Sequence, residues 1–519
     1  MNLLDLTIFL PLIGFFIILM VPGDNEDLVK KVAIGLALLV FIVSLGLIAP
    51  VLAAPHDFQF VDNAPWIDLG GVKINYHVGI DGLSLWLIIL ATFLTPLAML
   101  ISWKYIDHRV KEFFAFLILL EFGMIGVFAS LDLFLFYVFW EVALVPMYFL
   151  IGIWGHDRRI YAAVKFFLYT LAGSVLMLAA MIFISNRAKT FDYVDIVRNI
   201  QSGMLTFTHT EDLLLFLAFF IAFAIKVPLF PLHTWLPDAH VEAPTAGSVM
   251  LAAVMLKMGT YGLIRFCLPM FPGPAHDCAN WIMGLAVIGI VYGALVAMVQ
   301  PNMKKLVAYS SVSHLGFVVL GIFSFTQAGL DGAVYQMLAH GISTGALFML
   351  VGMMYERQHS LEIKAYGGVA TPAPNLTIFF VITTLASIGM PALSNFVGEY
   401  LVLQGTSKVS MMATVFASTG VIFSAVYMLW MVQRVFYGRA DGSLHMYDLT
   451  KREYFALVPM VAMMVWLGVY SQSFLPAVSS ENTEILKMIQ DHRMVPALAS
   501  TRAEAQRIAT TAEAQPNAR

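Results

Sequence analysis

Long runs of apolar residues, separated by short polar stretches, follow one another along most of the chain. A run of about 20 apolar residues is what a helix needs to cross the hydrocarbon core of a bilayer. Strands of a membrane barrel would instead alternate in polarity over about 10 residues, and the runs do not alternate. The pattern predicts an all-α polytopic membrane protein with about fourteen transmembrane helices. These are expected at residues 3–21, 29–52, 80–103, 112–130, 132–152, 162–185, 212–235, 244–267, 280–300, 304–326, 331–355, 375–404, 411–437 and 453–472.

Proline interrupts two of the predicted helices. The seventh breaks within KVPLFP and the twelfth at Pro391, and an offset of five spans places the two units in opposite orientations. Broken helices at corresponding positions of inverted halves indicate the working site of a transporter. We therefore expect two inverted five-helix repeats. The expected division is 1–110 for helices 1–3 with an external hairpin, 111–270 for helices 4–8, 271–440 for helices 9–13, and 441–519 for the last helix and a C-terminal tail.

Three polar features lie outside these spans. Residues 53–79 alternate in polarity around a Gly-Gly pair, which predicts a β-hairpin. The segment after Ser471 begins with a possible amphipathic stretch, ENTEILKMIQ, and ends in a polar tail that is predicted to be disordered and whose role is open. Lysine and arginine follow the odd-numbered spans far more often than the even-numbered ones. Because short cytoplasmic loops collect these residues, both termini are predicted outside.

The composition excludes a soluble protein, and the motifs that are missing from the sequence argue against several kinds of chemical site. The chain is 60% hydrophobic and 12% charged, with a mean hydropathy of +0.82. Its two cysteines, Cys267 and Cys278, form no CxxC motif, and neither paired-histidine haem spacing nor a nucleotide-binding glycine loop is present. We predict no redox centre, metal site or ATP site in this chain, and the net charge of −4 gives no indication of nucleic-acid binding.

Ionisable residues inside the first half of the spans are candidates for an ion path. A charge at the centre of a membrane helix costs roughly 2.5 to 3.5 kcal/mol on insertion scales and therefore usually has a function. Lys226 stands beside the break of span seven, and Glu141 near the middle of span five is the partner we propose for it. Burial favours a neutral lysine and a nearby carboxylate favours a charged one, so a change in their separation would load or release a proton. Lys257 lies too far from either end of span eight to reach an interface.

The second half of the chain continues the series. His314 and His340 lie in consecutive spans among serine and threonine residues. A lone histidine on an apolar face is often a packing residue, but two such residues with neighbouring hydroxyls favour a hydrated relay, since imidazole titrates near neutrality. Glu399 ends the series, and the alternative for it is an acid facing the interface near a helix end.

Further ionisable residues rank lower. Glu121 lies within span four and has no proposed partner. His233 and His240 could mark an access route beside the broken helix, although a solvated loop is the alternative for both. A group of basic loop residues is interpreted as setting the topology only: Arg158, Arg159, Lys304 and Lys305.

The motif KVPLFPLHTWLPDAHVEAPTAGSVMLAAVMLKMGTYGLIRF, followed by SVSHLGFV, QMLAHGISTGALF and MPALSNFVGEYLVL, resembles the antiporter-like subunits of respiratory complex I over roughly residues 80–440. The resemblance implies fourteen helices with two inverted five-helix repeats. Glutamate at position 399 is typical of one branch of the family, since the others typically carry lysine there. The implied roles are Glu141 and Lys226 as a charge pair, Lys257 as the central connection, His314 and His340 as relay groups, and Glu399 as the terminal group.

The resemblance also implies a function. The chain would be a non-redox subunit of an NADH:quinone oxidoreductase that moves protons while quinone is reduced elsewhere in the complex. NADH, FMN, iron–sulfur clusters and quinone would belong to partner subunits, and its neighbours would be other antiporter-like subunits and lipids. The expected location is a bacterial inner membrane with both termini on the periplasmic side. One alternative is a subunit of a multisubunit cation/proton antiporter, and another is a structural spacer without a proton path.

Overall fold

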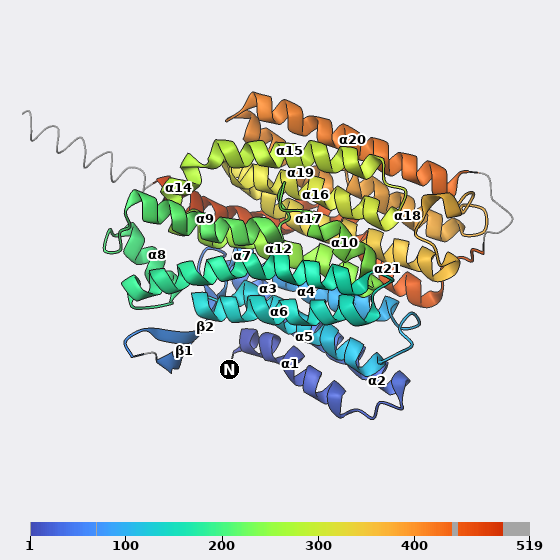
Figure 1. Cartoon of the computed structure of the whole chain (residues 1–519), viewed down its shortest axis with the longest axis horizontal. Helices are drawn as coiled ribbons and strands as arrows, with labels where there is room; N and C mark the ends of the chain where they lie inside the picture. Colours follow the sequence, from blue (N-terminus) through green and yellow to red (C-terminus); the bar gives the residue numbers. More distant parts are fainter. Residues whose placement is uncertain (1, 69, 439–444, 491–519) are drawn as a thin grey trace, which may run out of the picture.

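The computed structural model describes residues 2–68, 70–438 and 445–490, and its helices run side by side in one bundle (Figure 1). Within these residues, twelve helices are long and apolar enough to cross a membrane. They coincide with twelve of the fourteen predicted spans. They are α1 (Leu3–Met20), α2 with α3 (Glu26–Leu45, Ile48–Ala53), α4 (Gly82–Ile101), α5 (Val110–Ala129), α6 (Leu133–Trp154), α7 (Arg159–Ala188), the continuous helix Thr245–Met270, α15 (Ala279–Met298), α16 (Met303–Ile322), α17 (Gln327–Gln358), α20 (Met411–Phe436) and α21 (Lys451–Val469).

The two remaining spans are broken, as predicted. One consists of α9 (His209–Lys226) and α10 (Trp235–Glu242), and the other of α18 (Pro374–Ser387) and α19 (Ser394–Ser407). The first break contains two prolines, which lack the N–H that a helix requires. The second contains Gly389, whose φ of +74° favours glycine. The division into two inverted repeats stays a prediction.

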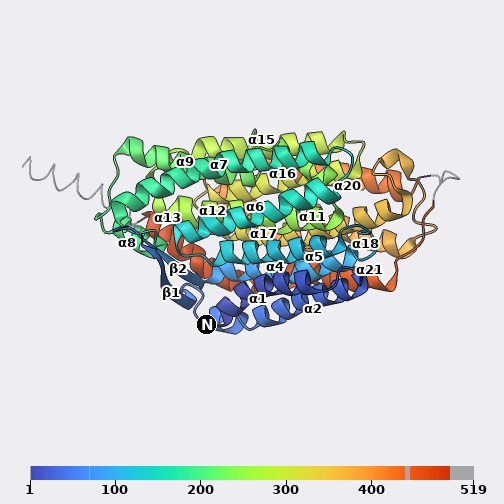
Figure 2. The ribbon, with the colours of Figure 1, turned by 60° about the horizontal axis from the view of Figure 1, so that its bottom comes forward.

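The predicted hairpin is confirmed. Strands β1 (Gln59–Asp68) and β2 (Lys73–Ile80) pair antiparallel. The hairpin lies at the end of the bundle where α1 begins (Figures 1 and 2), and Asn2 Nδ2 donates to Phe60 O at 2.6 Å. We call this end of the bundle the hairpin face, and it also carries α8 (Tyr193–Gln201). We call the opposite end the basic face, and it carries the loops before α7 and α16.

Two buried carboxylates fix the hairpin to the bundle. His77 Nδ1 of β2 lies 2.6 Å from Asp192, the residue that caps α8. Burial by itself would raise the pKa of Asp192, but the hydrogen bond and charge of His77, together with backbone N–H donors, hold it below its ordinary value. Asp132 caps α6 and also accepts from Asn75 N at 3.1 Å. Asp132 is only 1% exposed, so this carboxylate is a buried anchor of the hairpin.

The amphipathic segment predicted after Ser471 is confirmed as a helix over residues 475–490. It packs on the hairpin face, where Asn482 Nδ2 donates to Asp331 Oδ1 at 2.8 Å. The start of α1 and this helix therefore lie on one face, as an even number of spans requires. The predicted disorder of the polar tail lies outside the described residues.

The two most deeply buried spans are Thr245–Met270 and α17, whose apolar windows are completely buried, whereas only 28% of the window of α2 is. Glycine allows the two central helices to approach closely, because a Cβ added at Gly341 would lie 2.9 Å from Ala253 O. These central helices carry Lys257 and His340. Neither residue faces lipid.

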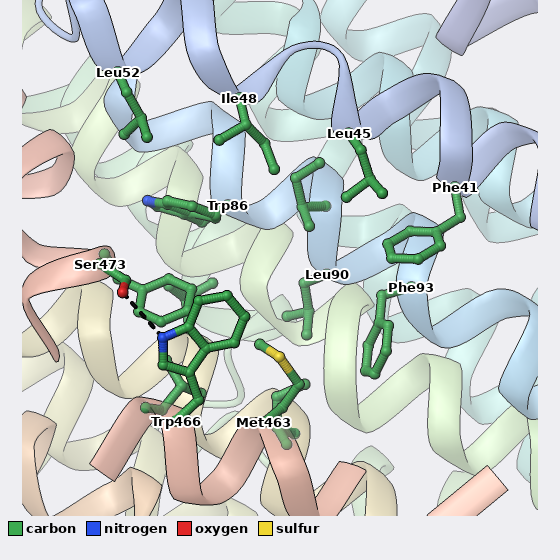
Figure 3. Close-up of a pocket in the computed structure, with 15 residues that line it drawn as sticks. Phe41, Leu45, Ile48, Leu52, Trp86, Leu90, Phe93, Met463, Trp466 and Ser473 are labelled. Carbon is green, nitrogen blue, oxygen red and sulfur yellow. Dashed lines mark hydrogen bonds between the residues drawn. The ribbon is translucent and has the colours of Figure 1, made fainter. Parts of the chain in front are cut away.

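An apolar groove of about 410 Å³ opens on the outside of the bundle, between α2, α4 and α21 (Figure 3). Its polar atoms are confined to Trp86, Trp466 and Ser473, and Trp466 Nε1 donates to Ser473 Oγ at 3.0 Å. Among the described residues that line the groove, none has an ionisable side chain. The candidate chemistry therefore lies in the interior of the bundle.

Candidate functional site

Lys257 occupies the middle of the central helix, in α12 (Leu256–Gly262), between two wide π-helical turns at Leu251–Met255 and Leu263–Cys267. Such turns occur frequently at functional sites. The lysine is 0% exposed, and its Nζ donates to Ala252 O at 2.7 Å. The same Nζ lies 2.7 Å from Nδ1 of His340. A proton can pass directly between these two nitrogens.

The row continues from His340 to Glu399. The rings of His340 and His314 lie 5.6 Å apart, centre to centre. Nδ1 of His314 lies 2.9 Å from Glu399 Oε1, which also accepts from Gln336 Nε2 at 3.1 Å. The structure thus brings four of the predicted residues into one buried row: Lys257, His340, His314 and Glu399.

The pattern of used and free nitrogen atoms suits a relay. His340 and His314 each use Nδ1 for an ionisable neighbour, which leaves each Nε2 without a hydrogen-bond partner in the described part of the chain. A transfer between the two rings would therefore use the Nε2 atoms. The separation of the rings is one that a ring rotation or a single bridging water can span.

The proposed partners Glu141 and Lys226 are not in contact. Lys226, the last residue of α9, is 0% exposed, and neither its Nζ nor Glu141 Oε1 has a hydrogen-bond partner among the described residues. The ammonium group lies over the rings of Trp140 and Phe166, at 5.1 and 5.6 Å from their centres. Aromatic faces attract a desolvated cation. The charge-pair role of these two residues stays a prediction.

Close helix packing brings Lys226 next to the row. A Cβ added at Gly259 would lie 2.9 Å from Phe223 O and 3.1 Å from Lys226 Cβ. Only glycine permits this approach of α9 to α12 without displacement. Lys226 therefore packs against the helix that carries Lys257, at Gly259, which lies two residues after that lysine.

The lower-ranked residues are all buried. Glu121 in α5 is 0% exposed, and its two oxygens lack a hydrogen-bond partner within the described ranges. His233 lies in the break of span seven against Phe230 and Tyr292, and His240 in α10 is stacked on Phe348 at 4.6 Å. Their relative exposures of 2% and 0% show that a solvated loop is the wrong interpretation for both histidines.

Lys304 is a candidate that the sequence interpretation missed. It is only 4% exposed, and its Nζ donates to Val241 O and Ala243 O at the end of α10. Its interpretation as a topology determinant only is therefore incomplete. One signal could have found it, because a lysine in the first turn of a helix opposes the helix dipole and calls for a special partner.

A polar cavity of about 320 Å³ opens on the basic face and is lined by His156, Glu242 and Tyr355, among others. Burial, with the nearby charge of Lys304, lowers the pKa of His156 to about 4, which keeps this imidazole neutral at pH 7. His240 lies within electrostatic reach of both Lys304 and Lys257. The arrangement places ionisable groups between the basic face and the central lysine.

Arg265 is a second residue that the sequence interpretation did not single out. It is 2% exposed and paired with Asp81 and Glu481. The pairing could not be found from spacing, since Glu481 is 216 residues away. The described residues contain no group of three or more histidine, cysteine, aspartate or glutamate side chains that could hold a metal ion.

Comparison with known proteins places the chain among membrane subunits. Residues 130–424 match the family described as "NADH:quinone oxidoreductase/Mrp antiporter, TM". The chain is 46% identical to NADH-quinone oxidoreductase subunit M of Rhodobacter capsulatus, over 90% of this chain and 93% of that protein. It is 40% identical to NADH-ubiquinone oxidoreductase chain 4 of Chondrus crispus, over 94% and 98% of the two chains.

Two solved structures share the fold. A chain of respiratory complex I from Thermus thermophilus with bound NADH has a TM-score of 0.85 and 31% identity, covering 94% of this chain and 100% of that one. The archaeal membrane-bound sulfane sulfur reductase has a TM-score of 0.79 and 23% identity over 90% and 76% of the chains, a likeness in fold alone. The predicted class, an all-α polytopic membrane protein, is confirmed. The chain belongs to the NADH:quinone oxidoreductase/Mrp antiporter family of membrane subunits.

Proposed function

We propose that the chain is the M subunit, the counterpart of chain 4, of a bacterial proton-pumping NADH:quinone oxidoreductase. The names and high coverage of its relatives support this assignment, as does the likeness to a chain of respiratory complex I. Glutamate at position 399 also matches this branch of the family. Its partners are the other membrane subunits. NADH, FMN, iron–sulfur clusters and quinone belong to those partners, and this chain carries out no redox step.

The observation that carries the proposal is the buried row from Lys257 to Glu399. A proton leaves Lys257 Nζ for Nδ1 of His340, and His340 releases one from Nε2. His314 takes it on Nε2 and passes one from Nδ1 to Glu399. Moving a proton against the membrane potential requires about 2.3 kcal/mol per 100 mV, which quinone reduction elsewhere in the complex supplies.

Protons enter this row from the basic face, by way of the cavity at His156, then Lys304 and His240. His233 beside the break and Glu121 in α5 are secondary groups of this access route. A change in the Glu141 to Lys226 separation switches the lysine between holding and releasing a proton. The basic face lies on the cytoplasmic side of the inner membrane, and the hairpin face with both termini on the periplasmic side.

Proton stoichiometry tests the proposal in the assembled complex. Glu399→Gln keeps the shape of the side chain but removes the charge, so fewer protons should be moved per electron at a given rate of NADH oxidation. The control is Glu112→Gln, because Glu112 is a half-exposed glutamate whose ion pair among the described residues is with Arg109. An unchanged stoichiometry in the Glu399 variant would support the spacer hypothesis. Copurification with cation-antiporter subunits, without NADH-oxidising ones, would support the antiporter alternative.

A further inference from the structure

A column of polar side chains leads from Lys257 to the hairpin face. Lys257, Tyr261 and Arg265 are spaced four residues apart and therefore lie on one side of their helix. The eight residues from Lys257 to Arg265 correspond to about 12 Å. Tyr261 is 1% exposed, its hydroxyl donates to Phe128 O at 3.2 Å, and Arg265 Nε donates to that hydroxyl at 3.3 Å.

The column ends in a buried cluster of charges. The Arg265 guanidinium donates through Nη1 to Glu481 Oε1 at 3.2 Å and through Nη2 to Asp81. The three side chains are between 1% and 8% exposed. Asp81 is itself fixed, because its Oδ1 caps α4 through Leu83 N and Ser84 N. The arginine is thus held between the start of α4 and the helix of residues 475–490.

Arg265 separates an outer cavity from Lys257. A cavity of about 290 Å³ on the hairpin face is lined by Arg265, Glu481, Arg198 and His56. Lys257 does not line it and is 0% exposed. The guanidinium therefore stands at the point where solvent from the hairpin face would meet the polar column.

We propose that Arg265, held by Asp81 and Glu481, is a fixed cationic seal that prevents protons from passing between Lys257 and the hairpin face. An arginine does not release its proton inside a protein, so it cannot serve as a relay group. A fixed arginine in a pore also repels protons and other cations. With this side closed, a proton on Lys257 cannot leave towards the hairpin face and remains available to His340. The inference rests on the proton row proposed above.

Passive proton permeability tests the seal without turnover. The assembled complex is reconstituted into liposomes, a pH gradient is imposed without NADH, and its decay is followed with an internal pH-sensitive dye. Arg265→Gln should accelerate the decay about tenfold, which corresponds to a barrier lowered by about 1.4 kcal/mol. Glu481→Gln should act in the same direction and serves if the first variant does not assemble. The control is Arg198→Gln, since this exposed arginine lines the same cavity but, in the part of the chain that the structure describes, pairs with Asp195 rather than with Asp81 or Glu481.

A double variant identifies the route. Adding Lys257→Met to Arg265→Gln should restore the slow decay, because the leak runs through the lysine. The proposal would be wrong if the pH gradient decayed as slowly in both the Arg265 and the Glu481 variants as in the unmodified complex. It would also be wrong if the fast decay persisted in the double variant. A purely structural cluster would alter assembly without altering permeability. Failure of the proposed function is seen separately, as normal proton stoichiometry in Glu399→Gln during turnover.

Discussion

Lys257 and His340 are in direct contact, with Nζ and Nδ1 2.7 Å apart, although 83 residues separate them in the chain. Both residues are completely buried, and they belong to the two most deeply buried spans. The contact joins the predicted first repeat to the predicted second one. Any proton that passes from one half of the protein to the other along the buried row crosses this pair of atoms.

Replacing His340 by glutamine should interrupt the row at this contact. An amide fills a similar volume but cannot take up and release a proton near neutrality, and a general acid–base group typically contributes about 100-fold or more to a transfer step. Proton pumping per electron should therefore fall in the His340→Gln complex, as measured in inverted membrane vesicles. The control is His209→Gln, because His209 is exposed at the start of α9. Equal pumping by the two variants would exclude His340 from the path.

The spans and their breaks could be predicted because hydropathy and proline act locally. Glu141, Lys226 and Lys257 were recognisable for the same reason, since a charge within an apolar run is conspicuous whatever surrounds it. The partners that bury Lys304 and Arg265 were not predictable, because they lie far away in the chain. The buried partners of Arg265, Asp81 and Glu481, lie 184 and 216 residues away in the chain.

Distances inside the site were also beyond the reach of the sequence. Position within the spans suggested Glu141 as a partner for Lys226, which stays a prediction, but it could not show that the ammonium group lies over the ring of Trp140. Which helices approach closely is decided by small residues such as Gly259, whose role depends on the backbone it faces. A single sequence does not reveal that backbone.

Gly259→Ala should separate Lys226 from the row. The added Cβ would lie 2.9 Å from the backbone oxygen of Phe223, so α9 must move away from α12. Overpacking of this kind costs about 1–3 kcal/mol. We expect a lower midpoint of thermal inactivation of the complex and reduced pumping per electron.

A matched glycine provides the control for that experiment. Gly284 lies in α15, and a Cβ added there meets nothing within 4 Å. Gly284→Ala should leave pumping unchanged and the thermal midpoint unchanged or slightly higher, since alanine favours a helix. Equal behaviour of the two alanine variants would show that close packing at Gly259 does not matter for pumping.

His77→Gln should loosen the hairpin without affecting proton movement. His77 holds the pKa of Asp192 below its ordinary value although burial opposes this, so the pair stabilises the folded state above the ordinary aspartate pKa. That contribution is fully present at pH 7 and is lost as the pH falls through the lowered pKa of Asp192. Loss of a buried charged hydrogen bond typically costs about 1–3 kcal/mol. Limited proteolysis at pH 7 should therefore cut the β1–β2 hairpin faster in this variant, with normal protons per electron. His56→Gln is the control, because His56 is half-exposed beside Asp57. A loss of pumping in the His77 variant alone would contradict this prediction and would give the His77–Asp192 pair a role in transport.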